Sequence, residues 1–377
     1  MGQKVGIKDV AERAGVSITT VSHALNGKGR INPETRRRVQ EVAERLGYRP
    51  NAVARNLAGG RTGLIGLAVA QTLERRFAVS DFAYYAQLMS AATVAAFDRG
   101  YALVLASGVE GSAWSRLMLD GAIVVDPVQD DPLCSQLRRR HVPLVTTGRV
   151  PGGREGFWVD NDHVAGTRAI IDHLAARGAQ RIALLASPPI TSYAIDARDS
   201  YEGWCSERGQ RPRVAIARAD LTEGSGFDAT LRLLRDASPP DAVYATLDRL
   251  ALGALLAAQA EGMAVPRELL VAGCTDSDAG RSARPSLTAL ALNPEEIGRE
   301  AVAMVAALIE GAHPPQPHVF VPTKILARGS TRRSDELRRT PRPGEPQPAR
   351  QARLRLPPQA PRSAPGSLSA VATQRLR

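Results

Sequence analysis

The first 48 residues place apolar positions at helical spacing in three short groups. Gly15 and Gly47 can end helices because glycine adopts positive φ readily, whereas Ser17 and Asn32 can act as N-caps, the latter with Pro33 at the first helical position. The buried faces that this spacing predicts are Ile7, Val10, Ala11 and Ala14; Val21, Ala24 and Leu25; and Val39, Val42, Ala43 and Leu46. This set is too small for the main core, so residues 1–48 form a separate helical headpiece.

From Leu64 onwards the pattern changes to short apolar runs that fit strands buried on both faces. These runs are LIGLAVA, ALVLAS, GAIVVD, PLVTTG, RIALLAS, DAVYATL and LLVAGC. Amphipathic stretches of helical length lie between them, such as YAQLMSAATVAAFDRG and HVAGTRAIIDHLAARG. Alternating strands and helices predict parallel sheets covered by helices, and there are too many units for one small sheet. We therefore expect an α/β core, residues 62–330, of two doubly wound parallel-sheet lobes: about 62–161, about 162–290, and a remainder that crosses between them.

Charge is segregated along the chain, whose overall net charge is +11. Residues 1–61 carry a net +7, residues 62–330 a net −4, and residues 331–377 a net +8. Clustered cations at both ends favour a polyanionic partner, because binding to phosphates releases counterions. Residues 49–61 are a polar hinge with one conspicuous apolar residue, Leu57. The tail, 331–377, has eight prolines and no aromatic residue, which predicts disorder.

Three isolated cysteines, Cys134, Cys205 and Cys274, form no CxxC pair, which argues against a disulfide framework or a zinc site. No run approaches the roughly 20 apolar residues that span a bilayer, and the first residues lack the apolar segment of a secretory signal. We expect a protein of the bacterial cytoplasm, associated with the nucleoid, without metal or cofactor.

The short turn AGVS separates the first two predicted helices, as in a helix-turn-helix. The outward side chains of the second helix suit DNA, because hydroxyls and amides reach phosphates or base edges and isoleucine can meet a thymine methyl. They are Ile18, Thr19, Thr20, Ser22, His23 and Asn26. The alternative is a small three-helix bundle with a solvated polar face.

A longer stretch makes the likeness specific. The segment IKDVAERAGVSITTVSHALNG, with RINPETRRRVQEVAERLGYRPNAVARNLAGGRTGLIGLAV after it, resembles the headpiece, hinge and first core strand of the lac repressor family (LacI/GalR). Later pieces agree, among them TRAIIDHLAARGAQRIALLAS, the Gly203-Trp204 step and RPSLTAL, so the resemblance covers roughly residues 5–330. It implies a homodimeric transcriptional regulator, commonly a repressor, that binds a palindromic double-stranded operator with an affinity set by a small-molecule effector. Activation and a tetramer remain alternatives.

The resemblance also assigns DNA-binding positions. Ile18, Thr19 and His23 fall where the family reads bases, and Thr20, Ser22 and Asn26 fall where it contacts phosphate. Asn51, Arg55 and Leu57 are the hinge members of the set, and Leu57 matches the wedge that enters the minor groove at the operator centre. Packing of Leu57 onto the core is the alternative.

The family implies a periplasmic-binding-protein-like core with the effector in the cleft, at the carboxyl ends of the strands. The positions implied are Asp160, Asn161, Ser200, Asp248 and Thr275, with Arg198 and Asp276 beside them. Ser200 stands where the family commonly has arginine, and Cys274-Thr275 stands where it often has aromatic-Asp. With both usual sugar anchors replaced, we expect an effector other than a simple neutral sugar bound in the common way. Surface salt bridges are the alternative role for Arg198 and Asp276.

Three other functions are less consistent with the sequence. An enzyme would need a catalytic motif, and no GxSxG, P-loop, GxGxxG or metal-spaced cluster is present. His163 and His173 lie ten residues apart, and we expect solvated or capping histidines. A solute-binding transport protein would lack the basic headpiece, and a non-specific architectural DNA-binding protein would not need two ligand-sized lobes.

Overall fold

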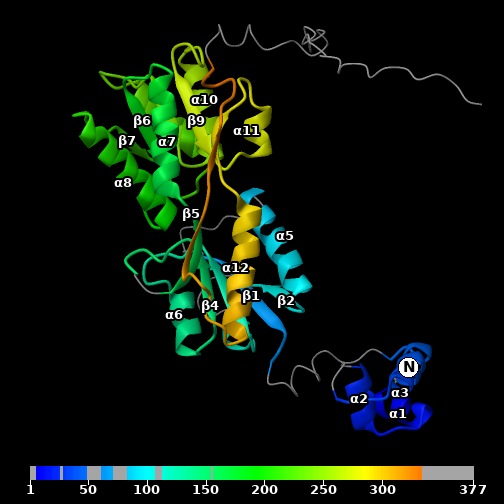
Figure 1. The fold of residues 1–377 in the computed structure, drawn as a ribbon. Helices are drawn as coiled ribbons and strands as arrows, with labels where there is room; N and C mark the ends of the chain where they lie inside the picture. The colour runs from blue at the N-terminus through cyan, green and yellow to red at the C-terminus, as the bar shows by residue number, and fades with distance from the viewer. Residues whose placement is uncertain are drawn as a thin grey trace, which may run out of the picture. The chain divides into compact units, whose positions relative to one another are not determined.

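A computed structural model of the chain describes residues 6–25, 29–48, 61–70, 83–106, 113–153 and 156–332. The headpiece and the core are described separately below (Figure 1). Most of the hinge and of the tail, including Asn51, Arg55 and Leu57, lies outside the described residues, as does Asn26.

The headpiece contains the three predicted helices, α1 (Ile7–Ala14), α2 (Ile18–Leu25) and α3 (Pro33–Arg45). Gly15 ends α1 in the left-handed region at φ 63°, and the Asn32 side chain accepts a hydrogen bond from the Glu34 backbone N–H at 2.9 Å at the start of α3. Of the eleven apolar residues predicted to pack together, eight are buried, and Ile7, Leu25 and Leu46 pack partly buried against them. The helical pattern and its caps are confirmed.

The first lobe is built on a six-stranded sheet in the order β11-β5-β4-β3-β1-β2, in which every pairing is parallel. Its strands are β1 (Leu64–Val69), β2 (Ala102–Leu105), β3 (Gly121–Val125), β4 (Leu144–Thr147), β5 (Phe157–Asn161) and β11 (His318–Val321). Its helices are α5 (Ala83–Asp98), α6 (Pro132–Arg139) and α12 (Pro294–Ile309), with a short 3-10 turn, η2 (Ala113–Ser115). Although α12 is distant in sequence, it packs on α5 so closely that a Cβ at Gly298 would lie 2.5 Å from the Leu88 carbonyl oxygen (Figure 1).

The second lobe repeats this plan with the order β12-β10-β9-β8-β6-β7. Its strands are β6 (Ile182–Ala186), β7 (Val214–Ile216), β8 (Ala242–Ala245), β9 (Leu270–Cys274), β10 (Thr288–Ala291) and β12 (Lys324–Leu326). Its helices are α7 (His163–Ala176), α8 (Ser192–Glu207), α9 (Glu223–Leu234), α10 (Asp248–Ala260) and α11 (Asp278–Ser282). Only β12 departs from the predicted parallel arrangement, since it pairs antiparallel with β10.

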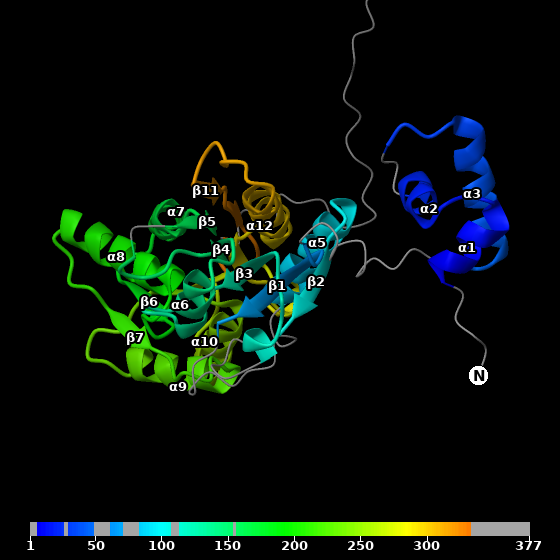
Figure 2. The same cartoon turned by 90° about the horizontal axis from the view of Figure 1, so that it is seen from below.

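Both sheets are covered on both faces, which explains the continuous apolar runs of their strands. Along β6, Ala183 and Leu185 join the cluster with α9 and α10, whereas Leu184 joins the cluster with α8. Figure 2 shows α8 and α9 on opposite sides of β6 and β7. The two lobes of parallel α/β structure expected from the alternation are therefore present.

The chain passes between the lobes three times, after β5, after β10 and after β11. Strand ends from both lobes consequently lie near these crossings. None of the described helices is long and apolar enough to cross a membrane.

Candidate DNA-binding face and effector pocket

Helix α2 presents a mixed polar and apolar face to solvent. Ile18 is 44% exposed, and Thr19 and His23 are exposed as well. Thr20 and Ser22 are half-buried, because they flank the side of the helix that packs inward. The described members of the predicted DNA-binding set thus share the outward side of one helix.

Local hydrogen bonds fix where α2 begins. Ser17 Oγ accepts the Thr20 backbone N–H at 3.0 Å and lies 2.8 Å from Thr20 Oγ1. This is the predicted N-cap, and it leaves the first turn of α2 with a satisfied backbone donor. Beyond the helix, Gly29 adopts φ 72°, and a Cβ there would lie 2.9 Å from His23 Nδ1, so a side chain at this position would displace the imidazole.

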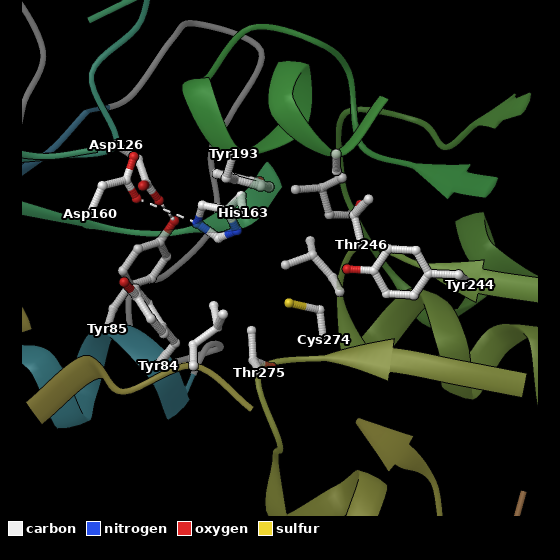
Figure 3. Close-up of a pocket in the computed structure, with 14 residues that line it drawn as sticks. Tyr84, Tyr85, Asp126, Asp160, His163, Tyr193, Tyr244, Thr246, Cys274 and Thr275 are labelled. Atoms are coloured by element: carbon white, nitrogen blue, oxygen red, sulfur yellow. Dashed lines mark hydrogen bonds and ion pairs between the residues drawn. The ribbon is translucent and has the colours of Figure 1, made fainter. Parts of the chain in front are cut away.

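A second candidate site lies in the core, where strand ends of both lobes meet around a pocket (Figure 3). Its empty volume is about 650 Å³, including the open mouth. The lining residues are mostly aromatic, aliphatic or acidic: Tyr84, Tyr85, Asp126, Asp160, His163, Tyr193, Ala197, Leu221, Tyr244, Thr246, Leu247, Cys274, Thr275 and Leu292. Asp126, Asp160, Thr246 and Thr275 lie at or just beyond the carboxyl ends of β3, β5, β8 and β9, where ligands bind in parallel sheets.

Two carboxylates and a histidine form the polar side of this pocket. The Tyr85 hydroxyl donates to Asp126 Oδ2 at 2.6 Å, and the Ser192 hydroxyl donates to Asp160 Oδ2 at 3.2 Å. His163 Nε2 lies 3.4 Å from Asp160 Oδ1, and both side chains are more than nine-tenths buried. Asp126 itself adopts φ 50°, a left-handed conformation that Asp and Asn tolerate better than most residues.

The carboxylates of this group shift the pKa values of the side chains beside them. Burial alone would lower the pKa of His163, yet the hydrogen bond and charge of Asp160, together with the charges of Asp126 and Asp196, raise it above its usual value. Burial raises the pKa of Tyr84 well above its usual value, and the charges of Asp126 and Asp160 raise it further. Both groups respond to the same two carboxylates, so the pocket stabilises positive charge.

The opposite side of the pocket is neutral. Tyr244, Thr246 and Cys274 face the acidic group from the second lobe (Figure 3). Burial, with the charge of Asp248 added, raises the pKa of the Cys274 thiol to about 12. Because the thiolate is the reactive form, Cys274 contributes a small apolar surface here rather than a nucleophile.

One ion pair links the loop after β4 to α8 beside this pocket. An Arg149 guanidinium nitrogen contacts both carboxylate oxygens of Asp196, and the Arg149 backbone N–H donates to Ser192 Oγ at 3.2 Å. Burial raises the pKa of Asp196, although Arg149 counteracts that shift. Arg149 is thereby held by a carboxylate of the protein and is not among the lining residues.

Of the effector positions expected from the sequence, the structure brings Asp160 and Thr275 to the pocket surface. Asn161 lies immediately behind it, where its amide Nδ2 donates to the Tyr84 hydroxyl at 3.5 Å and its Oδ1 accepts from the Asn293 backbone N–H at 3.4 Å. Asn161 therefore positions an aromatic residue of the pocket wall.

The other four expected positions are engaged elsewhere. Arg198 Nε donates to Glu202 at 2.7 Å on the surface of α8, and the Ser200 hydroxyl donates to the Val164 carbonyl at 3.0 Å. Asp248 accepts the Ser277 backbone N–H. Asp276 forms ion pairs with Arg281 at 3.0 Å and with Arg328 at 2.7 Å. Direct contact of these four with an effector stays a prediction.

The interpretation of His163 as a solvated or capping histidine is wrong. It is 7% exposed, because α7 begins directly after β5 and turns its first side chain towards Asp160. His173 is partly buried and lies 2.9 Å from the Thr331 hydroxyl. Asp126 was not among the expected positions, although it directly follows the apolar run GAIVV of β3, much as Asp160 lies near the carboxyl end of β5.

Four tyrosines were missed as well, and they account for more than half of the seven in the chain. They are Tyr84, Tyr85, Tyr193 and Tyr244. Their positions in three distant segments gave no local pattern that could have identified them.

Comparison with known proteins agrees with this architecture. Residues 6–51 match the family model for bacterial regulatory proteins of the lacI family, and residues 171–331 match the model for a periplasmic binding protein-like domain. The chain is 32% identical over 331 residues to the HTH-type transcriptional regulator CelR of Thermobifida fusca, a match that covers 85% of this chain and 96% of the relative. The chain belongs to the lacI family of bacterial regulatory proteins.

Other members of the lacI family are similar over comparable lengths. The HTH-type transcriptional repressor PurR of Salmonella newport is 29% identical, over 86% of this chain and 96% of PurR. A crystal structure of the lac repressor dimer bound to operator and the anti-inducer ONPF superposes with a TM-score of 0.75 at 26% identity, over 87% of this chain and 99% of that one. A CelR–cellobiose complex superposes with a TM-score of 0.65 at 29% identity, over 86% and 99%.

Membership of the lacI family indicates the functions of the headpiece and of the core. The protein is a helix-turn-helix transcriptional regulator whose headpiece binds DNA and whose α/β core responds to an effector. Proteins of this family are regulators rather than enzymes.

Proposed function

We propose that this regulator is a cytoplasmic repressor that binds a near-palindromic operator as a homodimer and releases or retains it in response to a ligand in the core pocket. The observation that supports it most directly is the outward face of α2, where Ile18, Thr19 and His23 stand exposed on a helix of helix-turn-helix geometry. Side chains of these types read base edges in the major groove.

Two-fold symmetry follows from the size of the headpiece. One module of this size offers too little interface for tight specific binding, so two must act together, and a symmetric dimer requires a symmetric site. The core supplies surface for pairing: on α5, Val94 is 60% exposed and Phe97 is 79% exposed. The lac repressor structure similar to this chain is that of a dimer on its operator.

The core pocket is the proposed effector site. It lies between the two lobes, and its acidic side is joined to the second lobe through the Ser192 hydroxyl bond to Asp160. A ligand that binds there contacts both lobes and favours one arrangement of them over another, which is how differential affinity shifts an equilibrium. CelR has been solved with cellobiose and the lac repressor with ONPF, so related proteins bind small molecules.

Selection of bound DNA from a random pool tests the DNA-binding part of the proposal. We expect enrichment of a near-palindromic site, protected symmetrically in footprinting, by a protein that sediments as a dimer at micromolar concentration. Removal of residues 1–48 should abolish selection and leave the dimer intact. A monomer that selects an asymmetric site would contradict the proposal.

A further inference from the structure

We infer that the effector is an organic cation, with a protonated nitrogen placed between Asp126 and Asp160 and a neutral, largely apolar body directed towards the second lobe. This inference rests on the proposed role of the core pocket as the effector site. Such a ligand differs from a neutral sugar in its charge, and charge is the property that the acidic side of the pocket favours.

The charged residues of the pocket favour a cationic ligand. Asp126 and Asp160 are its two carboxylates, and His163 is its only lining residue of basic character; no arginine or lysine is among the described residues that line it. Arg149, the nearby guanidinium, is held by both oxygens of Asp196. An anionic ligand would meet two carboxylates without a guanidinium to receive it, so its burial would be costly.

The aromatic residues of the pocket also favour a cation. Tyr84, Tyr85 and Tyr193 surround the acidic group, and the ring centroids of His163 and Tyr193 lie 5.9 Å apart (Figure 3). The faces of aromatic rings attract cations, most strongly where water is excluded. Carboxylates and ring faces together stabilise an ammonium group better than either does alone. Among the described residues no three His, Cys, Asp or Glu side chains converge as metal ligands, so the cation is organic.

The charged and the neutral lining residues lie on different sides of the pocket. Its charged groups all come from the first lobe and from the first turn of α7, whereas its aliphatic residues are Ala197, Leu221, Leu247 and Leu292. In Figure 3, Asp126 and Asp160 stand on the opposite side from Tyr244, Thr246 and Cys274. A ligand with one charged end and an aromatic or aliphatic body matches this arrangement, and a sugar with hydroxyls on every side does not.

Pairs of compounds that exchange an ammonium for a hydroxyl test the inference. We would titrate the full-length protein calorimetrically with tyramine and tyrosol, tryptamine and tryptophol, glucosamine and glucose, and with cellobiose. At least one of the amines should bind roughly tenfold or more tightly than its alcohol, because charge-assisted hydrogen bonds exceed neutral ones by that margin. Asp126→Asn should remove most of this preference, and asparagine is compatible with φ 50° at that position.

Asp199→Asn is the matched control, because it removes the same charge from an exposed position of α8 outside the pocket lining. It should leave the preference unchanged. If the alcohols bind as tightly as the amines, if only cellobiose or glucose binds, or if no amine of the set binds, the inference is wrong. Operator release measured in parallel separates it from the proposed function. A neutral sugar that releases operator would support the effector role and overturn the cation, whereas an amine that binds without changing operator affinity would do the reverse.

Discussion

The headpiece and the core pocket are built in opposite ways. The exposed face of α2 comes from one run of eight residues, and its support comes from a cluster confined to residues 7–48. The pocket draws side chains from segments as distant as Tyr84 and Leu292, brought together only by the order of strands in two sheets. The proposed DNA-binding face is therefore a local property of the chain, and the proposed effector pocket is a property of its topology.

This difference predicts that the two functions can be damaged separately. A substitution in the headpiece should change DNA preference without altering the pocket, and a substitution in the lobes should change ligand binding or core stability without altering base readout. Substitutions in the headpiece and in the core, taken from the largest expected effect to the smallest, test that separation.

Trp204→Ala should destabilise the core alone. Trp204 is 2% exposed, and its Nε1 donates to Asp172 at 2.7 Å. Truncation leaves a large cavity in the second lobe and should lower the free energy of unfolding by about 3–5 kcal/mol. In calorimetry we expect the core transition to move to lower temperature while the headpiece transition stays in place. Equal shifts of both transitions would show that the headpiece and the core unfold as one unit. That result would contradict the claim that the two can be damaged separately.

The headpiece and the strands were more predictable from the sequence than the pocket, along the same division. The period of the apolar positions and the caps Gly15 and Asn32 define the headpiece, since both signals act within a few residues. Apolar runs also predicted β1, β3, β4, β6, β8 and β9, because strands buried on both faces are continuously apolar, and they predicted the edge strand β2 although its side chains are only half-buried or exposed. The short edge strands β7, β11 and β12 bury less and escaped this criterion.

The pocket was predictable only in part for a physical reason. Asp160 and Thr275, which the family resemblance implied, do line the pocket, whereas Asp126 lines it although it was not among the implied positions. Arg198 and Ser200 were placed by family position, yet a neighbouring glutamate and a neighbouring carbonyl engage them. Partners that lie one helical turn away or on another helix cannot be identified without the fold.

Asp248→Asn should change how core stability depends on pH. Burial raises the pKa of Asp248 to about 6 from its ordinary value of 3.8. Between these values the folded protein retains a proton that the unfolded chain has lost, so the stability associated with this group is present below pH 4 and is lost as the pH rises to about 6. The full cost, about 3 kcal/mol, applies above pH 6.

Denaturant titrations of both proteins from pH 4 to pH 7 measure this effect. Asparagine can still accept the Ser277 N–H, so the variant should gain on the wild type as the pH rises. A difference that does not vary with pH would show that the carboxyl is already ionised in the folded core at pH 4. DNA selection by the variant should be unchanged, since Asp248 lies in the core.

His23→Ala should relax recognition of one base pair in each half-site, at a cost of roughly 1–3 kcal/mol for the preferred operator. The imidazole is exposed on α2, so its removal leaves the headpiece cluster intact. Competition among operators with single base changes measures the loss of discrimination. A uniform loss over all sequences would instead indicate a phosphate contact, and ligand affinity should not change in either case.

The smallest effect is expected for Arg198→Ala and Ser200→Ala, and it decides whether the pocket rearranges when occupied. Arg198 is paired with Glu202 on the surface of α8, with side chains 42% and 37% exposed, so its loss should cost at most about 1 kcal/mol of stability. Ser200 loses one hydrogen bond to the Val164 carbonyl, a comparable amount. Because neither residue lines the pocket, ligand affinity should be unchanged within twofold, whereas Thr275→Ala, which alters the lining itself, should reduce it. A tenfold loss of ligand affinity in Arg198→Ala would mean that the guanidinium leaves Glu202 and turns into the occupied pocket. That result would place a guanidinium of the protein in the occupied pocket and would argue against a cationic effector. It would also show that topology alone does not determine which side chains contact the ligand.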